Sequence, residues 1–143
     1  MLHMHVTSWI LGLILFLVAL FLYKQGNEKG GKIVHMILNR KTEEALAMLS
    51  NFYHIDVPKI AVGTIKGKRR TVYAVYVRKE KKIYAINSDI FYNPFVILHE
   101  FYHHLRSKSD IHRGSEKHAN MYAQVFVNSY EKIAVSLKCD KSS

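Results

Sequence analysis

The eighteen residues from Val6 to Tyr23 contain no charged side chain, and this run restricts the fold more than any other feature of the chain. A helix rises about 1.5 Å per residue, so the run would be about 27 Å long, just enough to cross the hydrocarbon core of a bilayer. A helix that is apolar on every side can also be buried in a core, but a chain of 143 residues has little protein to surround it. The run therefore predicts a single transmembrane anchor over residues 1–23.

A cleaved signal peptide is the alternative for this segment, and two features argue against it. No Lys or Arg precedes the apolar run, and no pair of small residues with cleavage-site spacing follows it. Basic residues follow the run within about twenty positions, so the positive-inside rule predicts that the rest of the chain is cytoplasmic. These residues are Lys24, Lys29, Lys32, Arg40 and Lys41. The single cysteine, Cys139, excludes an internal disulfide and is compatible with a reducing compartment.

The residues after the anchor divide into a linker and one domain. Residues 24–31 are polar and rich in glycine, which predicts an irregular linker, and residues 32–143 are enough for one domain. The spacing of apolar residues predicts a short helix over residues 33–38. A second helix is predicted from Thr42 to Tyr53, with Thr42 as its N-cap.

The middle of the chain changes to the pattern of short strands. Three segments rich in β-branched and aromatic residues are joined by probable turns at 65–68 and 79–81, which predicts an antiparallel meander. Two long helices follow, so the expected fold class is α+β. The three predicted strands are Lys59–Gly63, Thr71–Arg78 and Lys82–Asn87.

The stretch from His99 to His103 spells H-E-x-x-H and indicates a metal site. Residues four apart lie on one face of a helix, so the imidazole rings of His99 and His103 can bind the same ion. Glu100 lies about 100° further round the helix, close enough to act as a general base. Pro94 is favoured in a first helical turn and predicts where this helix begins. The opposite face, which is expected to pack, carries Leu98, Phe101, Tyr102 and Leu105.

A catalytic zinc ion takes three protein ligands, so a third ligand is expected outside this helix. The best candidate is Glu116, because Gly114 indicates a turn and Ser115 an N-cap, which together place Glu116 in the first turn of a new helix. Asn120 follows one turn later, where it can form a hydrogen bond to a ligand. The other candidates that remain open are Asp110, His112 and His118.

The H-E-x-x-H motif followed by E-x-x-A-N resembles the gluzincin-type zinc metallopeptidases, and most closely the ImmA/IrrE-like peptidases and the archaeal minigluzincins. The likeness covers roughly Lys59 to Leu137. It implies a minimal zincin-like domain, made of a helix, a three-stranded meander and two active-site helices. The zinc ligands that it implies are His99, His103 and Glu116, with Glu100 as catalytic base.

The expected function is therefore that of a membrane-anchored metallopeptidase with one catalytic Zn²⁺ ion. It would hydrolyse a peptide or protein substrate with a zinc-activated water and Glu100 as general base. The oxyanion would need a further hydrogen-bond donor, and the side chains within reach in the sequence leave this choice open. They are Tyr92, His104, Arg113, His118 and Tyr122, of which His104 is interpreted as a polar surface residue.

The net charge of +10 supports an alternative function. Basic residues are concentrated at 66–70 and 78–82, where they can bind an acidic substrate, anionic lipid headgroups or nucleic acid. The protein would then be a non-catalytic, membrane-anchored protein that binds zinc, nucleic acid or lipid. Solvated turns at the edges of a sheet explain the same charges without a partner, so nucleic acid is not the favoured partner.

Overall fold

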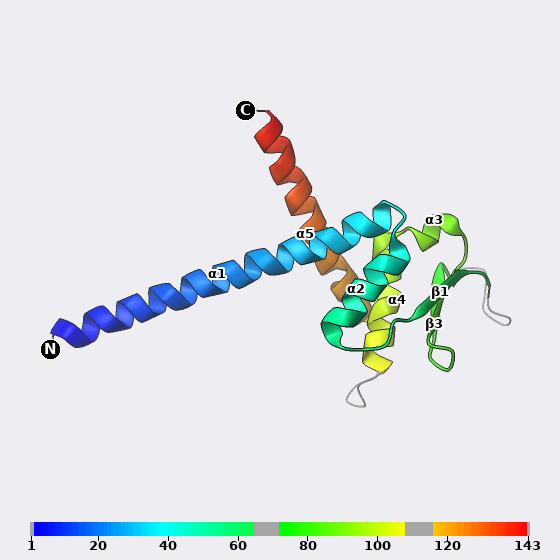
Figure 1. Cartoon of the computed structure of the whole chain (residues 1–143), viewed down its shortest axis with the longest axis horizontal. Coiled ribbons are helices and arrows are strands. Elements are labelled where there is room, and N and C mark those ends of the chain that lie inside the picture. The colour runs from blue at the N-terminus through cyan, green and yellow to red at the C-terminus, as the bar shows by residue number, and fades with distance from the viewer. Residues whose placement is uncertain (1, 65–71, 108–115, 143) are drawn as a thin grey trace.

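The computed structural model describes residues 2–64, 72–107 and 116–142, with side chains from residue 10 onward except at 23 and 24. Its fold is mixed α+β, as predicted, and is mostly helical with one small sheet (Figure 1). The elements in chain order are α1 (Leu2–Leu38), α2 (Thr42–Tyr53), β1 (Lys59–Val62), β2 (Ala74–Val77), β3 (Lys82–Ala85), α3 (Ser88–Phe91), α4 (Pro94–Ser107) and α5 (Glu116–Lys141).

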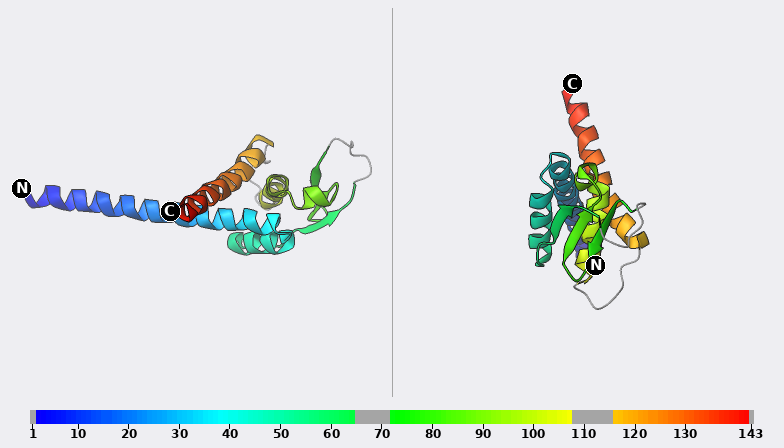
Figure 2. Two further views of the ribbon diagram at one scale, coloured as in Figure 1. Left: turned by 90° about the horizontal axis from the view of Figure 1, so that it is seen from above. Right: turned by 90° about the vertical axis from the view of Figure 1, so that its right-hand side faces the viewer.

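Helix α1 has two parts with different surroundings. Its N-terminal part extends away from the domain as a single rod (Figure 2), and the apolar side chains from Ile10 to Leu22 are exposed. By length and composition, the stretch Ile10–Leu38 qualifies as a membrane-spanning helix, and its most apolar 18 residues are not covered by the described chain. The C-terminal part of α1 lies in the domain, where Ile33, Val34 and Ile37 are buried.

The predicted linker at residues 24–31 is wrong, because α1 runs through it without a break. Two glycines there are buried against α5. A Cβ atom added to Gly30 would lie 3.4 Å from the Cβ of Ser129, and one added to Gly31 would overlap Cδ1 of Ile133. The glycines therefore let two helices approach closely, and this packing outweighs the cost of about 1 kcal/mol that each glycine imposes on a helix.

Replacing Gly31 by Leu is expected to destabilise the protein by separating α1 from α5. Overpacking of a close contact costs about 1–3 kcal/mol, which lowers the Tm of the full chain in detergent by several degrees. The matched control is Gly26→Leu on the same helix, because a Cβ atom added to Gly26 meets nothing within 4 Å. The control is expected to keep or raise the Tm, and equal losses in both variants would contradict the close contact.

The sheet is mixed and is not the predicted antiparallel meander. Its strand order is β1-β3-β2, with β3 antiparallel to β2 but parallel to β1. Strand β3 takes the central place because Ile83 and Ala85 are fully buried, whereas both ends of β1 are exposed. The turn between β2 and β3 is confirmed, and Lys81 adopts a positive φ of 50° in it. The other predicted turn, at 65–68, lies outside the described residues.

The second helix and the metal-site helix begin close to where the sequence predicts. Helix α2 has the predicted bounds, but its N-cap is Lys41, and Thr42 is buried and donates its hydroxyl hydrogen to the carbonyl of Phe91 (2.9 Å). Helix α4 begins at Pro94 as predicted, and Asn93 Oδ1 accepts a hydrogen bond from the N–H of Val96 (3.2 Å). Helix α4 packs against α5 and against β2, which places it at the centre of the domain.

Candidate metal centre

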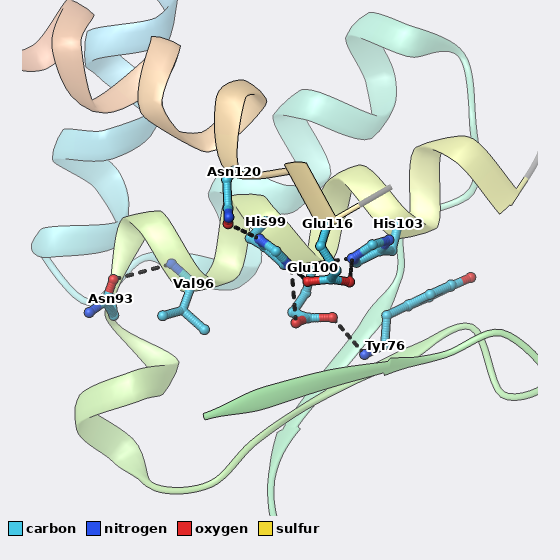
Figure 3. Close-up of polar contacts among 8 residues, drawn as sticks. All are labelled: Tyr76, Asn93, Val96, His99, Glu100, His103, Glu116 and Asn120. Atoms are coloured by element: carbon cyan, nitrogen blue, oxygen red, sulfur yellow. Dashed lines mark hydrogen bonds and ion pairs between the residues drawn. The ribbon is translucent and has the colours of Figure 1, made fainter. Parts of the chain in front are cut away.

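Three side chains from two helices converge on one point between α4 and α5 (Figure 3). Glu116 Oε2 lies 2.9 Å from His99 Nε2, and Glu116 Oε1 lies 3.0 Å from His103 Nε2. The two histidine Nε2 atoms are 3.2 Å apart. The structure therefore brings together the two histidines of H-E-x-x-H and the glutamate predicted as the third ligand. In the part of the chain that it describes, this cluster contains Glu116 and not His118.

The spacing of these three side chains suits a small divalent cation. Zinc binds histidine nitrogen at about 2.0–2.1 Å, and tetrahedral geometry then separates its ligand atoms by about 3.3 Å. The observed separations are 2.9–3.2 Å, with His99 and His103 each next to a different oxygen of Glu116, so a metal held by one or both carboxylate oxygens requires only small movements. The histidine side chains are mostly covered, at 13% and 21% exposure, whereas Glu116 is 77% exposed, so the cluster has an open side among the residues that the structure describes.

A hydrogen bond orients His99, and burial disfavours the charged form of His103. Asn120 Oδ1 lies 2.8 Å from Nδ1 of His99 and accepts a hydrogen bond from it in the tautomer that leaves Nε2 available to a metal. Burial lowers the pKa of His103 below its ordinary value of 6.5, although the Glu116 carboxylate raises it. Asn120 thus lies next to His99, one of the ligands that the sequence predicts.

The carboxylate of Glu100 lies beside the cluster and is only 8% exposed. Its Oε1 atom is 4.0 Å from His99 Nε2, too far to share the tight spacing of the three ligand atoms. Its Oε2 atom accepts a hydrogen bond of 2.8 Å from the backbone N–H of Tyr76 in β2. One oxygen is therefore anchored to the sheet while the other points towards the cluster (Figure 3).

The interpretation of His104 as a surface residue is wrong, because its side chain is completely buried. Its Nε2 atom lies 2.8 Å from the carbonyl oxygen of Asp56 and its Nδ1 atom 2.9 Å from the hydroxyl of Tyr76. The same hydroxyl lies 3.2 Å from Oγ of Ser107. Both the backbone and the side chain of Tyr76 are therefore hydrogen-bonded to α4: its N–H to Glu100 and its hydroxyl to His104.

Sequence reasoning missed this role of Tyr76 and His104. The one signal for it is that His104 lies about 140° from His99 on the helix, between the ligand face and the packing face. Burial and these contacts also make His104 unsuitable as a donor to an oxyanion.

The structure gives the surroundings of three other candidate donors to the oxyanion, Tyr122, Tyr92 and His118. The hydroxyl of Tyr122 pairs with that of Tyr53 at 3.1 Å, and burial raises its pKa, so it is a neutral packing residue. The ring of Tyr92 lies under the guanidinium of Arg40, at 5.4 Å. His118 is exposed in the first turn of α5. The remaining candidates of the sequence analysis lie outside the described residues: Arg113 as donor, Asp110 and His112 as ligands, and the predicted turn and cap at Gly114 and Ser115.

Comparison with known proteins identifies a family match over the first helix and the turn after it. A family model described as "Protein of unknown function (DUF1516)" matches residues 2–41. A UPF0344 protein of Oceanobacillus iheyensis is 68% identical over 38 residues, which are 27% of this chain and 31% of the relative. A UPF0344 protein of Bacillus licheniformis is 63% identical over 38 residues, 27% of this chain and 32% of the relative. The UPF0344 protein YisL of Bacillus subtilis is 53% identical over 38 residues, 27% of this chain and 32% of the relative.

The chain thus spans about a third of the length of the curated relatives that it matches. No solved structure matches it. The matched segment is α1 and the turn after it, which contain none of the residues of the metal cluster.

These matches correct the assignment to the gluzincin-type peptidases. The family that matches is one of unknown function, and it matches residues 2–41 instead of the range 59–137 on which the resemblance was based. Two short motifs specify a local ligand geometry on a pair of helices, and that geometry is not specific to one family. Any function must therefore be argued from the site itself.

Proposed function

We propose that this protein is a membrane-anchored, zinc-dependent hydrolase of peptide bonds. The observation that carries the proposal is the position of Glu100, a buried carboxylate that lies next to a set of three closely spaced ligand atoms without being part of it. Three protein ligands with an open side are typical of catalytic zinc sites, whereas structural sites are closed by a fourth protein ligand.

In this proposal, some residues of the site bind the metal and another transfers the proton. A zinc ion, when bound, supplies a water of lowered pKa and polarises the carbonyl group of the substrate. Glu100 accepts the proton of the attacking water at Oε1 and later delivers it to the leaving amine. The N–H of Tyr76 holds the other oxygen of Glu100 in place, and Asn120 orients His99.

A polypeptide substrate is supported by the strand next to Glu100. Among the described residues, strand β2 lies at an edge of the sheet, and its backbone contacts Glu100 at Tyr76. Extended peptides bind to edge strands through main-chain hydrogen bonds, so β2 offers a surface on which a peptide bond can be presented to the site.

The alternative function gains no support from the described basic residues. Arg78 donates to the carbonyl of Ser107 at 3.3 Å, and Lys81 forms an ion pair of 3.0 Å with Asp56. Their turn also lies at the end of the domain away from the free part of α1, so it would face away from a membrane crossed by α1 (Figures 1 and 2). The other basic stretch, at 66–70, lies outside the described residues. Lipid or nucleic acid binding stays a prediction.

The test of the proposal is cleavage of casein, an unstructured protein, by the full chain in detergent. Cleavage is expected to stop when a chelator removes the metal and to return when about one equivalent of Zn²⁺ is added. Protein loaded with one zinc ion that cuts neither casein nor itself would contradict the proposal.

A further inference from the structure

We infer that the substrates of this site are polypeptide segments that emerge from the same membrane, cut at a short and fixed distance from the bilayer surface. The inference rests on the proposed function and adds the class of substrate. It follows from how α1 and α5 connect the apolar segment to the metal cluster.

No flexible linker separates the apolar segment of α1 from the domain. Helix α1 is continuous from Leu2 to Leu38, so the rod that would cross the membrane also forms part of the core. The two glycines at 30 and 31 pack on α5, and Ser129 Oγ donates to Asn27 Oδ1 at 3.1 Å. Helix α5 is therefore fixed to α1 only a few residues after the apolar run ends.

The metal cluster lies a short distance from the point where α5 packs on α1. Gly30 lies seven residues after Tyr23, or about 10 Å along α1. It contacts Phe126 of α5, which lies ten residues, or about 15 Å, after Glu116. Whatever the tilt of α5, Glu116 then lies within about 25 Å of the level of Tyr23.

The distance of Glu116 from the bilayer surface determines which substrates can reach the metal cluster. An extended chain advances about 3.4 Å per residue, so about eight residues are enough to bridge 25 Å from the bilayer to the cluster. A substrate anchored in the same bilayer also gains a high effective concentration, which a soluble substrate lacks. Because the domain cannot move away from the membrane on a flexible linker, bonds close to the surface are favoured.

The experiment is a molecular ruler in liposomes that contain the full chain. Single-span reporters carry the casein sequence that the protein cuts, placed about 4, 8, 12 and 20 residues from the reporter's own span. The tethered reporter with 12 residues is expected to be cut at least about 100-fold faster than the same sequence as a soluble peptide. Four extended residues span only about 14 Å, so the shortest tether is expected to be cut the slowest of the four.

Insertion of seven helix-forming residues at Gly26 raises the domain by about 10 Å and keeps the faces of α1 nearly in phase. The shortest reporter that is cut is then expected to lengthen by about three residues. The matched control places the same insertion before Val6, which leaves the height unchanged. Unaltered casein cleavage in detergent shows that both variants fold.

The outcomes separate the two proposals. Equal rates for tethered and soluble sequences, or a shortest tether that does not respond to the insertion at Gly26, would overturn the inference while the peptidase function stands. Failure of the zinc-loaded protein to cut casein in detergent would overturn the proposed function and the inference with it.

Discussion

Replacing Glu100 by Gln is expected to lower kcat for peptide cleavage by about 10²–10⁴-fold, because a positioned general base contributes that much to catalysis. Gln has nearly the same shape, and its carbonyl oxygen can still accept the hydrogen bond from the N–H of Tyr76. It cannot accept a proton from water at neutral pH. The variant should therefore bind one zinc ion, as measured by elemental analysis, and show little turnover.

The control for this substitution is Glu43→Gln, which changes an exposed carboxylate on α2. It is expected to leave both zinc content and kcat unchanged. Loss of zinc from the Glu100 variant would show that Glu100 is itself a ligand, and full activity would remove it from the mechanism.

Replacing Glu116 by Ala is expected to weaken zinc binding by at least about 100-fold. Loss of a group that only orients a ligand already costs about 10–100-fold, and Glu116 contributes a ligand atom directly. The fold should survive, because the Glu116 side chain is 77% exposed. The measurement is competition for zinc with a chelating dye, together with the rise in Tm that added zinc produces.

The matched control here is Glu131→Ala, an exposed glutamate on the same helix. It removes the same charge without touching the cluster and is expected to leave zinc affinity unchanged. An unchanged affinity in the Glu116 variant would transfer the ligand role to His112 or His118.

The parts of the site that the sequence predicts well depend on local geometry. The start of α4 at Pro94 follows from the stereochemistry of proline, and the pairing of His99 with His103 follows from helical periodicity. Glu116 and Asn120 were placed by the same periodicity on the next helix, and both meet the histidines.

Apart from the family assignment, the errors concern contacts between residues far apart in the chain. Glycines in a linker and glycines at a close helix contact have the same appearance in sequence, and the partner of Gly31 is about 100 residues away on α5. The order of the strands depends on which strand supplies the most buried side chains, which no local pattern reports. Likewise, His104 is buried only because Asp56 and Tyr76 come to it from other elements.

Helix α5 contributes both to the candidate metal cluster and to the contact with α1. Its first residue is Glu116, and Ser129 in its middle packs on α1. Metal binding at one end and seating of α1 at the other therefore draw on the same folding free energy. If the cluster binds a metal as proposed, thermodynamic linkage would be reciprocal: a seated α1 would raise the affinity for metal, and a bound metal would strengthen the seating of α1. Chains whose first helix has not docked would then hold metal more weakly than correctly assembled protein.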